Sequence, residues 1–220
     1  MTLSELNNEL INCRRCPRLV EWREKVAREK RRAYLDYEYW GKPVPGFGDA
    51  HAEVLVVGLA PGAHGSNRTG RQFTGDASGE FLYSALFRAG FASQPESVSR
   101  DDGLTLYNLY TAPVCRCAPP DNKPLPEELD NCRPYLEGEI EIIQPKVFVA
   151  LGRLAFEGIL SLYNLPKNTF DFSHNAVHQL PDWKYLVCSY HPSRQNTQTG
   201  RLTPEMFDQV WKTVQGLISK

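Results

Sequence analysis

Short apolar runs alternate with longer amphipathic stretches along this chain, and this alternation predicts a parallel sheet. A run of Val and Leu at 54–57 ends at Gly58 and is typical of a buried strand. Three more apolar runs, at 104–110, 147–151 and 185–190, are predicted as strands of the same kind. Each strand is followed by a helical pattern, which predicts an α/β fold: a three-layer sandwich with a central four-stranded parallel sheet and helices on both faces.

The helical stretches extend beyond the sheet region to the N-terminal quarter of the chain. Apolar residues at helical spacing predict helices over 3–12, around 19–26, and over 77–90, 126–143, 153–163 and 204–217. Residues 34–47 cannot form one regular element, because Pro43 and Pro45 lack an N–H group. We therefore predict a single domain over residues 1–220, in which an arm of residues 1–50 packs on an α/β core of residues 51–220.

Composition narrows the class of protein. A length of 220 residues suits one substantial core, and a charged fraction of 23% is typical of a soluble globular protein. No apolar run approaches the roughly 20 residues that span a bilayer, and the N-terminus lacks the apolar segment of a secretory signal. We expect a cytoplasmic monomer with no membrane partner.

The net charge of −1 hides a strong asymmetry along the chain. Residues 14–32 contain nine Lys or Arg against three Glu, whereas residues 121–141 contain seven acids against two bases. One face could therefore meet a phosphate backbone while the whole molecule stays neutral. Two solvated helices laced with ion pairs remain an equal alternative.

The loop after the first strand is the best candidate for a binding site. Residues 58–76 contain five glycines, which permit close backbone approach, and two cations, Arg68 and Arg71, which would suit a phosphate. Asp76 precedes a helical pattern and is the natural N-cap of that helix. The spacing of a Walker loop or a dinucleotide turn is absent. An ordinary capped turn is the alternative, although so long a connection usually binds something.

Three of the four predicted strands end in unusual loops, at 58–76, 111–124 and 189–201. Ligands of parallel sheets bind outside the carboxyl ends of the strands, so these loops are expected to meet. The last loop contains no acid and places His191 directly after its strand. Its polar side chains, among them Arg194, Gln195, Asn196 and Arg201, suit phosphates and base edges. A lone histidine is nevertheless more often structural than catalytic.

Six cysteines in a cytoplasmic chain favour metal binding or catalysis over disulfides. Cys13 and Cys16 form a C-x-x-C motif that, together with Cys117 and Cys132, gives a four-thiolate set for an iron–sulfur cluster or a structural zinc. Cys115 competes with Cys117, which we prefer because two prolines follow it. Four unligated thiols remain possible, and Cys188 is expected in the core.

Together these segments resemble a known family. GLAPGAHGSNRTGRQFTGD at 58–76, CRCAPPDNKP at 115–124, YHPSRQNTQTGR at 190–201 and the four cysteines are similar to the family 5 uracil-DNA glycosylases, the UDGb type, of bacteria and archaea. The resemblance extends from about Leu10 to about Phe207. It implies an α/β fold with a four-stranded parallel sheet, a 4Fe–4S cluster, and excision of uracil and related deaminated bases from DNA.

The resemblance also implies roles for individual residues. Cys13, Cys16, Cys117 and Cys132 would hold the cluster, and Phe73 would stack on the extruded base. Related glycosylases carry an acidic or amide side chain where this chain has Leu59 and Ala60, so Asp76 becomes the expected catalytic carboxylate beside His191. The base pocket would comprise Gly58, Leu59, Ala60, Phe73, Pro113 and Asn122. DNA would contact Arg68, Arg71, Ser193, Arg194, Gln195, Asn196 and Arg201.

The expected activity is that of a monofunctional glycosylase in base excision repair. Family 4 enzymes read the uracil edge with an asparagine at the position of Pro113, which has neither a side-chain amide nor an N–H group. We therefore expect hypoxanthine and xanthine to be removed as well as uracil. The alternatives are a non-catalytic iron–sulfur protein that binds single-stranded nucleic acid, and a redox module.

Overall fold

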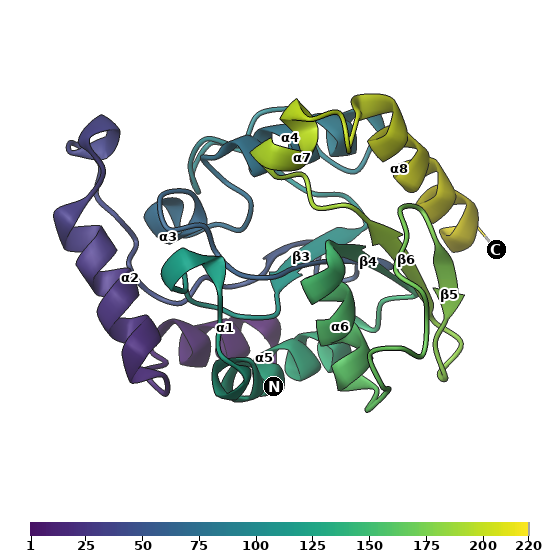
Figure 1. The fold of residues 1–220 in the computed structure, drawn as a ribbon, viewed down its shortest axis with the longest axis horizontal. Coiled ribbons are helices and arrows are strands. Elements are labelled where there is room, and N and C mark those ends of the chain that lie inside the picture. Colours follow the sequence, from purple (N-terminus) through teal and green to yellow (C-terminus); the bar gives the residue numbers. More distant parts are fainter. Residues whose placement is uncertain (220) are drawn as a thin grey trace.

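A computed structural model of the chain describes residues 1–219, in which a six-stranded mixed sheet has the order β1-β3-β2-β4-β6-β5 (Figure 1). The strands are β1 (Phe47–Gly48), β2 (Val54–Gly58), β3 (Leu109–Pro113), β4 (Val147–Leu151), β5 (Val177–Gln179) and β6 (Tyr185–Ser189). The four inner strands pair in parallel, and the edge strands β1 and β5 pair antiparallel. The prediction of four strands was therefore incomplete, because strands of two or three residues show no hydrophobic period.

Helices cover both faces of the sheet, as predicted. One face carries α4 (Ala77–Arg88) and α8 (Pro204–Ile218), and the other carries α5 (Pro126–Ile143) and α6 (Arg153–Leu162) (Figure 1). Val54 and Val56 of β2 pack toward the first pair, and Leu55 and Val57 toward the second. Both faces are buried, which is why β2 is an uninterrupted apolar run.

The predicted strand at 104–110 was wrong by about five residues. Leu106 forms only an isolated bridge with Ala92, and Asn108 turns the chain at a φ of +52°. The Asn108 side chain accepts a hydrogen bond from the Glu53 N–H at 2.7 Å, so β3 enters the sheet only at Leu109. The apolar pattern of 104–110 therefore belongs mostly to the segment that leads into the sheet, and not to the strand itself.

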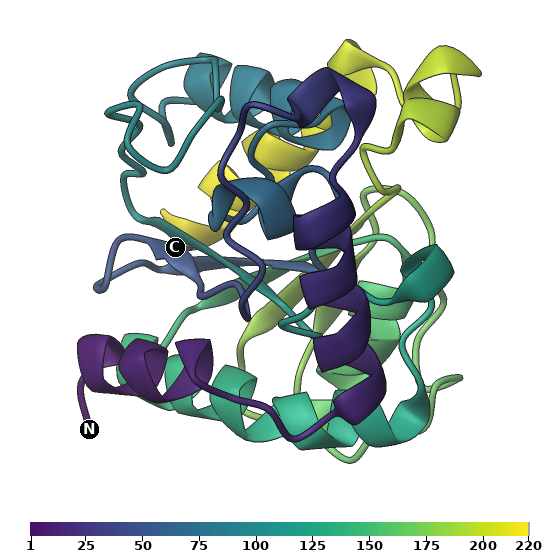
Figure 2. The ribbon, with the colours of Figure 1, turned by 90° about the vertical axis from the view of Figure 1, so that its left-hand side faces the viewer.

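The N-terminal arm packs along one side of the core. Leu6 and Leu10 of α1 (Leu3–Ile11) contact Tyr135 of α5, and Figure 2 shows the two helices side by side. Helix α2 (Pro17–Glu29) runs beside α3 (Ser66–Thr69) in the same view, and the turn η1 (Arg32–Tyr34) lies beyond the upper end of α2. Further short helices that the pattern did not predict are η2 (Pro120–Asn122) and α7 (Arg194–Gln198).

None of the helices within residues 1–219 has both the length and the apolar composition needed to cross a membrane.

Candidate active site

The loops that follow β2, β3 and β6 meet at the carboxyl edge of the sheet. Gly58 pairs with Pro113, the last residue of β3, and the next two N–H groups, of Val114 and Cys115, donate to the carbonyls of Gly58 and Leu59 at 2.9 and 2.8 Å. Gly152 after β4 donates to the Ser189 carbonyl at 2.8 Å. The predicted pocket residues Gly58, Leu59 and Pro113 therefore lie at one edge.

Phe73 lies over the end of β2. A Cβ atom on Gly58 would approach the Phe73 Cζ to 2.7 Å, so the ring rests on a glycine that leaves room for it. The centroids of the Phe73 and His191 rings are 6.3 Å apart. Phe73 is buried and has a φ of +52°, an unfavourable backbone conformation for an aromatic residue that the surrounding loop must hold. The loops after β2 and β6 thus bring two predicted site residues together.

Asp76 uses its two carboxylate oxygens differently. Oδ1 accepts hydrogen bonds from the N–H groups of Ser78 and Gly79, both at 3.0 Å, and so caps α4 as predicted. Oδ2 has no hydrogen-bond partner within residues 1–219 and faces the glycines of the loop, since Cβ atoms on Gly62 and Gly65 would lie 3.1 and 2.0 Å from it. Burial raises the pKa of Asp76, and the two backbone hydrogen bonds partly oppose this shift.

His191 follows β6 directly. Burial lowers the pKa of His191 to about 4, so the imidazole is neutral at physiological pH. Its carbonyl accepts a hydrogen bond from the Asn196 side chain at 2.9 Å, and a Cβ atom on Gly152 would lie 3.2 Å from the His191 Cβ. The neighbouring strand end and the turn of α7 therefore hold this histidine in place.

The two arginines of the first loop are structural, which corrects the prediction that they supply charge for a phosphate. Arg71 is buried and forms an ion pair with Asp102 through contacts of 2.6 and 2.7 Å. Arg68 is also buried and donates to the carbonyls of His64 and Gly75 at 2.8 and 2.9 Å. Arg68 thus links two carbonyls of its own loop, and Arg71 ties the loop to the segment that contains Asp102.

The loop after β6 presents several of its predicted DNA-contacting side chains to solvent. Arg194 and Gln195 are exposed on α7, for which Ser193 is the N-cap. Arg201 is exposed and lies 4.7 Å from the centroid of the Tyr190 ring. The side-chain amide of Asn196 donates to the His191 carbonyl, and its contact with DNA stays a prediction.

Two further residues of the predicted pocket differ in their surroundings. Ala60 is half-buried and packs against the side chains of Cys115, Cys117 and Cys132. Asn122 is exposed in η2 with a φ of +56°, and its side chain makes no hydrogen bond within residues 1–219. Ala60 therefore links the first loop to the cysteines, whereas Asn122 is free to meet a ligand.

Four of the six cysteines line one small cavity: Cys13, Cys16, Cys117 and Cys132. They come from the connection between α1 and α2, from the loop after β3 and from α5. The Cys115 thiol instead points to the Cys117 carbonyl at 3.4 Å, and Cys188 is a buried core residue as predicted. The cavity is therefore lined by Cys117 and not by Cys115, which packs beside Cys117 and Cys132.

Polar groups already surround this cavity. The Arg23 guanidinium donates to the Cys117 sulfur at 2.8 Å and the Arg116 N–H to the Cys132 sulfur at 3.4 Å. Buried donors beside thiols suit sulfur that carries negative charge, as it does when bound to metal. Within residues 1–219 no three His, Cys, Asp or Glu side chains converge closely enough to hold a single metal ion. Four thiolates around one cavity suit an iron–sulfur cluster or a structural zinc ion.

Comparison with known proteins identifies the family. The model of the Uracil DNA glycosylase superfamily matches residues 45–215. The Type-5 uracil-DNA glycosylase of Thermus thermophilus is 56% identical over 202 residues, which cover 91% of this chain and 91% of that protein. The chain belongs to the type-5 uracil-DNA glycosylases.

More distant relatives agree with this assignment. The Type-5 uracil-DNA glycosylase of Mycobacterium leprae is 49% identical over 220 residues, covering 98% of this chain and 96% of that protein. The Type-4 uracil-DNA glycosylase of Archaeoglobus fulgidus is 30% identical over 196 residues, covering 87% and 82%. The family predicted from the motifs is therefore confirmed, and neither a non-catalytic binding protein nor a redox module is favoured.

Two contacts in this type-5 glycosylase were not predicted from sequence. Arg23 is buried on the same face of α2 as Leu19 and Val26. A charged residue on this apolar face was the signal in the sequence that could have indicated a buried partner for Arg23. The Tyr39 hydroxyl lies 2.9 Å from the His64 Nδ1 and joins the arm to the first loop. No local pattern predicts this contact, because it spans two irregular segments.

Proposed function

We propose that this type-5 uracil-DNA glycosylase hydrolyses the N-glycosidic bond of uracil in DNA through Phe73, Asp76 and His191, as a monofunctional enzyme of base excision repair. The placement of the Phe73 ring between Gly58 and His191 is the observation that carries the proposal. A base inside a duplex must be extruded before it reaches such a site, and stacking on Phe73 would hold it there.

Asp76 and His191 supply complementary chemistry. The second oxygen of Asp76 faces the loop and can orient a water molecule toward the sugar carbon and accept its proton. As the bond between sugar and base breaks, its electron pair leaves with the base, and the still ionised carboxylate balances the positive charge that develops on the sugar. The oriented water then adds to the sugar carbon through its oxygen, and its proton passes to Asp76. The neutral His191 can donate a hydrogen bond to the anionic base.

Hydrolysis without a lyase step follows from the composition of the two catalytic loops. Neither residues 58–76 nor residues 189–203 contain a lysine, the side chain that would form a Schiff base with the sugar. We expect the abasic product to remain uncleaved.

The substrate range is broader than uracil in this proposal and includes hypoxanthine and xanthine. Pro113 pairs with Gly58 at the pocket edge and offers no hydrogen-bond donor there. A pocket that stacks and fills rejects related bases less strongly than one built to pair a specific edge. Asn122 remains the exposed amide available for a contact with the base.

Cys13, Cys16, Cys117 and Cys132 would hold a 4Fe–4S cluster. Their shared cavity and the donors that face the sulfurs support a metal site here, and the resemblance to the family favours a cluster over zinc. Such a cluster would serve structure, because its ligands come from the arm, the loop after β3 and α5. Pure protein is expected to be brown and to contain iron, and we infer a monomer that works in the cytoplasm.

The experiment that tests the activity is the release of free base. Protein incubated with a uracil-containing oligonucleotide is expected to liberate uracil and leave an intact abasic strand. Binding of the oligonucleotide without release of uracil would overturn the proposal and leave a non-catalytic binding protein.

A further inference from the structure

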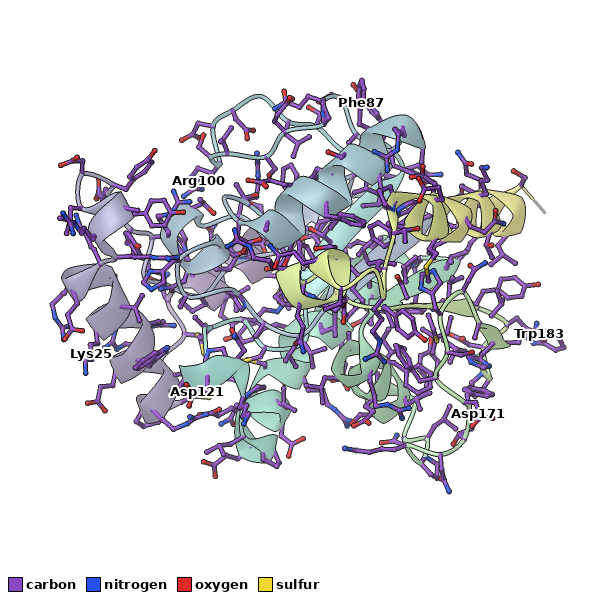
Figure 3. The ribbon with its side chains drawn as sticks, turned by 45° about the horizontal axis from the view of Figure 1, so that its top comes forward. Lys25, Phe87, Arg100, Asp121, Asp171 and Trp183 are labelled. Carbon is purple, nitrogen blue, oxygen red and sulfur yellow. The ribbon has the colours of Figure 1, made fainter. Side chains whose placement is uncertain are left out.

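A surface groove of about 470 Å³ lies between the arm and the loop that follows α4. Its walls come from residues 37–42, the end of α3 and residues 98–101. Figure 3 shows the labelled Arg100 beside α3, in the part of the molecule next to η1. Arg68 and Thr69 are the only residues of the loop at 58–76 that line this groove within the described chain, so it is distinct from the proposed base pocket.

Trp40 forms a fixed wall of the groove. Its indole N–H donates to the Pro43 carbonyl at 2.9 Å, and its backbone N–H donates to the Arg68 carbonyl at 2.9 Å. Gly70 has a φ of +76°, and a Cβ atom there would lie 2.8 Å from the Trp40 ring. The indole is thus held by the loop at 58–76 on one side and by its own arm on the other.

Two cations lie over this indole. The Arg100 guanidinium is 4.5 Å and the Lys42 ammonium 5.4 Å from the centroid of the Trp40 ring. Both side chains are exposed, and neither forms an ion pair within residues 1–219. Each cation is thus accessible at the wall of the groove, where a phosphate could accept a charge-assisted hydrogen bond from it.

The acids of the groove leave these cations unneutralised. Glu38 and Asp101 also line the groove, but neither forms an ion pair within the described residues. Arg68 is buried and committed to carbonyls, so Lys42 and Arg100 are the accessible positive groups in the groove. The groove therefore carries both acidic and basic side chains, and a phosphate would be attracted most strongly to Lys42 and Arg100.

The arm that carries this groove is fastened directly to the proposed catalytic loop. The Gly41 N–H donates to the Asn67 carbonyl at 3.0 Å, and the Tyr39 hydroxyl meets the His64 ring nitrogen at 2.9 Å. The same loop continues to Phe73 and Asp76. The wall of the groove is therefore joined, through α3, to the loop that carries the proposed base pocket.

We propose that Lys42 and Arg100 bind phosphate groups of the DNA strand that flanks the extruded nucleotide, with Trp40 as the platform that positions both cations. The inference rests on the proposed function and adds a second contact surface to the base pocket. It assigns the groove to the sugar–phosphate backbone, so binding there is independent of sequence.

Kinetics on two DNA lengths test this assignment. Arg100→Ala and Lys42→Ala are compared with Lys212→Ala, which removes an exposed cation on α8 at the other end of the molecule (Figure 1). On a uracil-containing duplex of about 30 base pairs, each groove variant should raise KM with kcat unchanged and reduce the salt slope by about 1. Lys212→Ala should change neither quantity.

A short substrate and a charge of opposite sign sharpen the test. A trinucleotide with a central uracil carries only the phosphates next to the extruded nucleotide, so its excision should change less in the groove variants than that of the long duplex. Asp101→Asn removes a negative charge from the groove and should tighten binding of the long duplex by about two- to fivefold.

The outcomes distinguish failure of the groove assignment from failure of the proposed function. Unchanged KM and salt slope in both cation variants would overturn the groove assignment while uracil release by wild type continued. Equal losses on the trinucleotide and the long duplex would also overturn it, because they would show a general structural effect. Absence of uracil release by the wild-type protein would instead refute the proposed function.

Discussion

The side chain of Asp76 combines a structural and a chemical task in one carboxylate. Its Oδ1 caps α4, while its Oδ2 faces the glycines of the first loop. A substitution that keeps the cap but removes the negative charge can therefore separate the two tasks.

Asp76→Asn is expected to fold normally and to lose excision. Asparagine caps a helix about as well as aspartate, so the free energy of unfolding should change by less than about 0.5 kcal/mol. The amide cannot accept a proton from water, and single-turnover release of uracil should fall by about 10²- to 10⁴-fold. Asp76→Ala, as a control, should also lose about 0.5 to 2 kcal/mol of stability. A wild-type rate for the Asn variant would remove Asp76 from the chemistry.

His191 makes the stability of the protein depend on pH. Its pKa is about 4 in the folded protein and about 6.5 when exposed, so the unfolded chain binds more protons between these values. Stability should therefore rise from pH 4 to pH 6.5, with up to about 3 kcal/mol contributed by this residue. Thermal unfolding of wild type and His191→Gln at both pH values checks this, and an equal pH dependence in the two proteins would contradict it.

Pro113 offers the test of substrate range. Pro113→Asn would place an amide at the pocket edge beside Gly58, where it can pair with the uracil edge. The ratio of uracil to hypoxanthine and xanthine excision from matched oligonucleotides should rise, because a site built to pair an edge rejects other edges. Strict uracil specificity in the wild type, or an unchanged ratio in the variant, would show that Pro113 only shapes the bend after β3.

At the scale of elements, the loop from β2 to α4 depends on space that its glycines leave. Gly65→Ala would bring a methyl group to 2.0 Å from the Asp76 Oδ2, so the carboxylate must move. Uracil release should fall at least about tenfold, since a small misplacement of a catalytic group is costly. Gly216→Ala in α8 meets no atom within 4 Å, and should keep the rate and add up to about 1 kcal/mol of stability. A fully active Gly65→Ala variant would mean that Asp76 need not occupy its present position.

The hydrophobic pattern predicted the strands that are buried on both faces. It failed where contacts with distant segments determine the conformation of the chain. Strands β2 and β4 are buried on both faces, so continuous apolar runs located them. Strand β3 was displaced because Asn108 turns the chain through bonds to residues far away in sequence. Glycines, Asp76 and His191 signalled a site at the right edge of the sheet. The burial of Arg71 could not be predicted, because its partner Asp102 lies in an irregular segment.

At the scale of the whole molecule, the cysteine cavity connects segments that are distant in sequence. It joins the arm to the loop after β3 and to α5, and Ala60 of the first loop packs against the cluster that contains two of its cysteines, Cys117 and Cys132. Loss of this site should therefore loosen the arm and the catalytic loop together.

Cys132→Ser is expected to reduce soluble yield and iron content before it affects chemistry, since metal binding is coupled to folding. Wild type should contain about four iron atoms per chain. Cys115→Ser is the matched control, because Cys115 does not line the cavity, and it should keep both iron and activity. A colourless, zinc-loaded wild-type protein with full activity would refute the cluster.

Because there is no room for a Cβ atom at Gly58 and Gly65, the codons for these two glycines are sensitive to cytosine deamination. Glycine codons begin with two guanines, which pair with cytosines on the opposite strand. Deamination of either cytosine, left unrepaired, replaces glycine by serine, arginine, aspartate or glutamate, and each of these carries the Cβ atom that neither position can hold. The lesion that type-5 enzymes are named for removing is thus one that would disable the gene encoding this one.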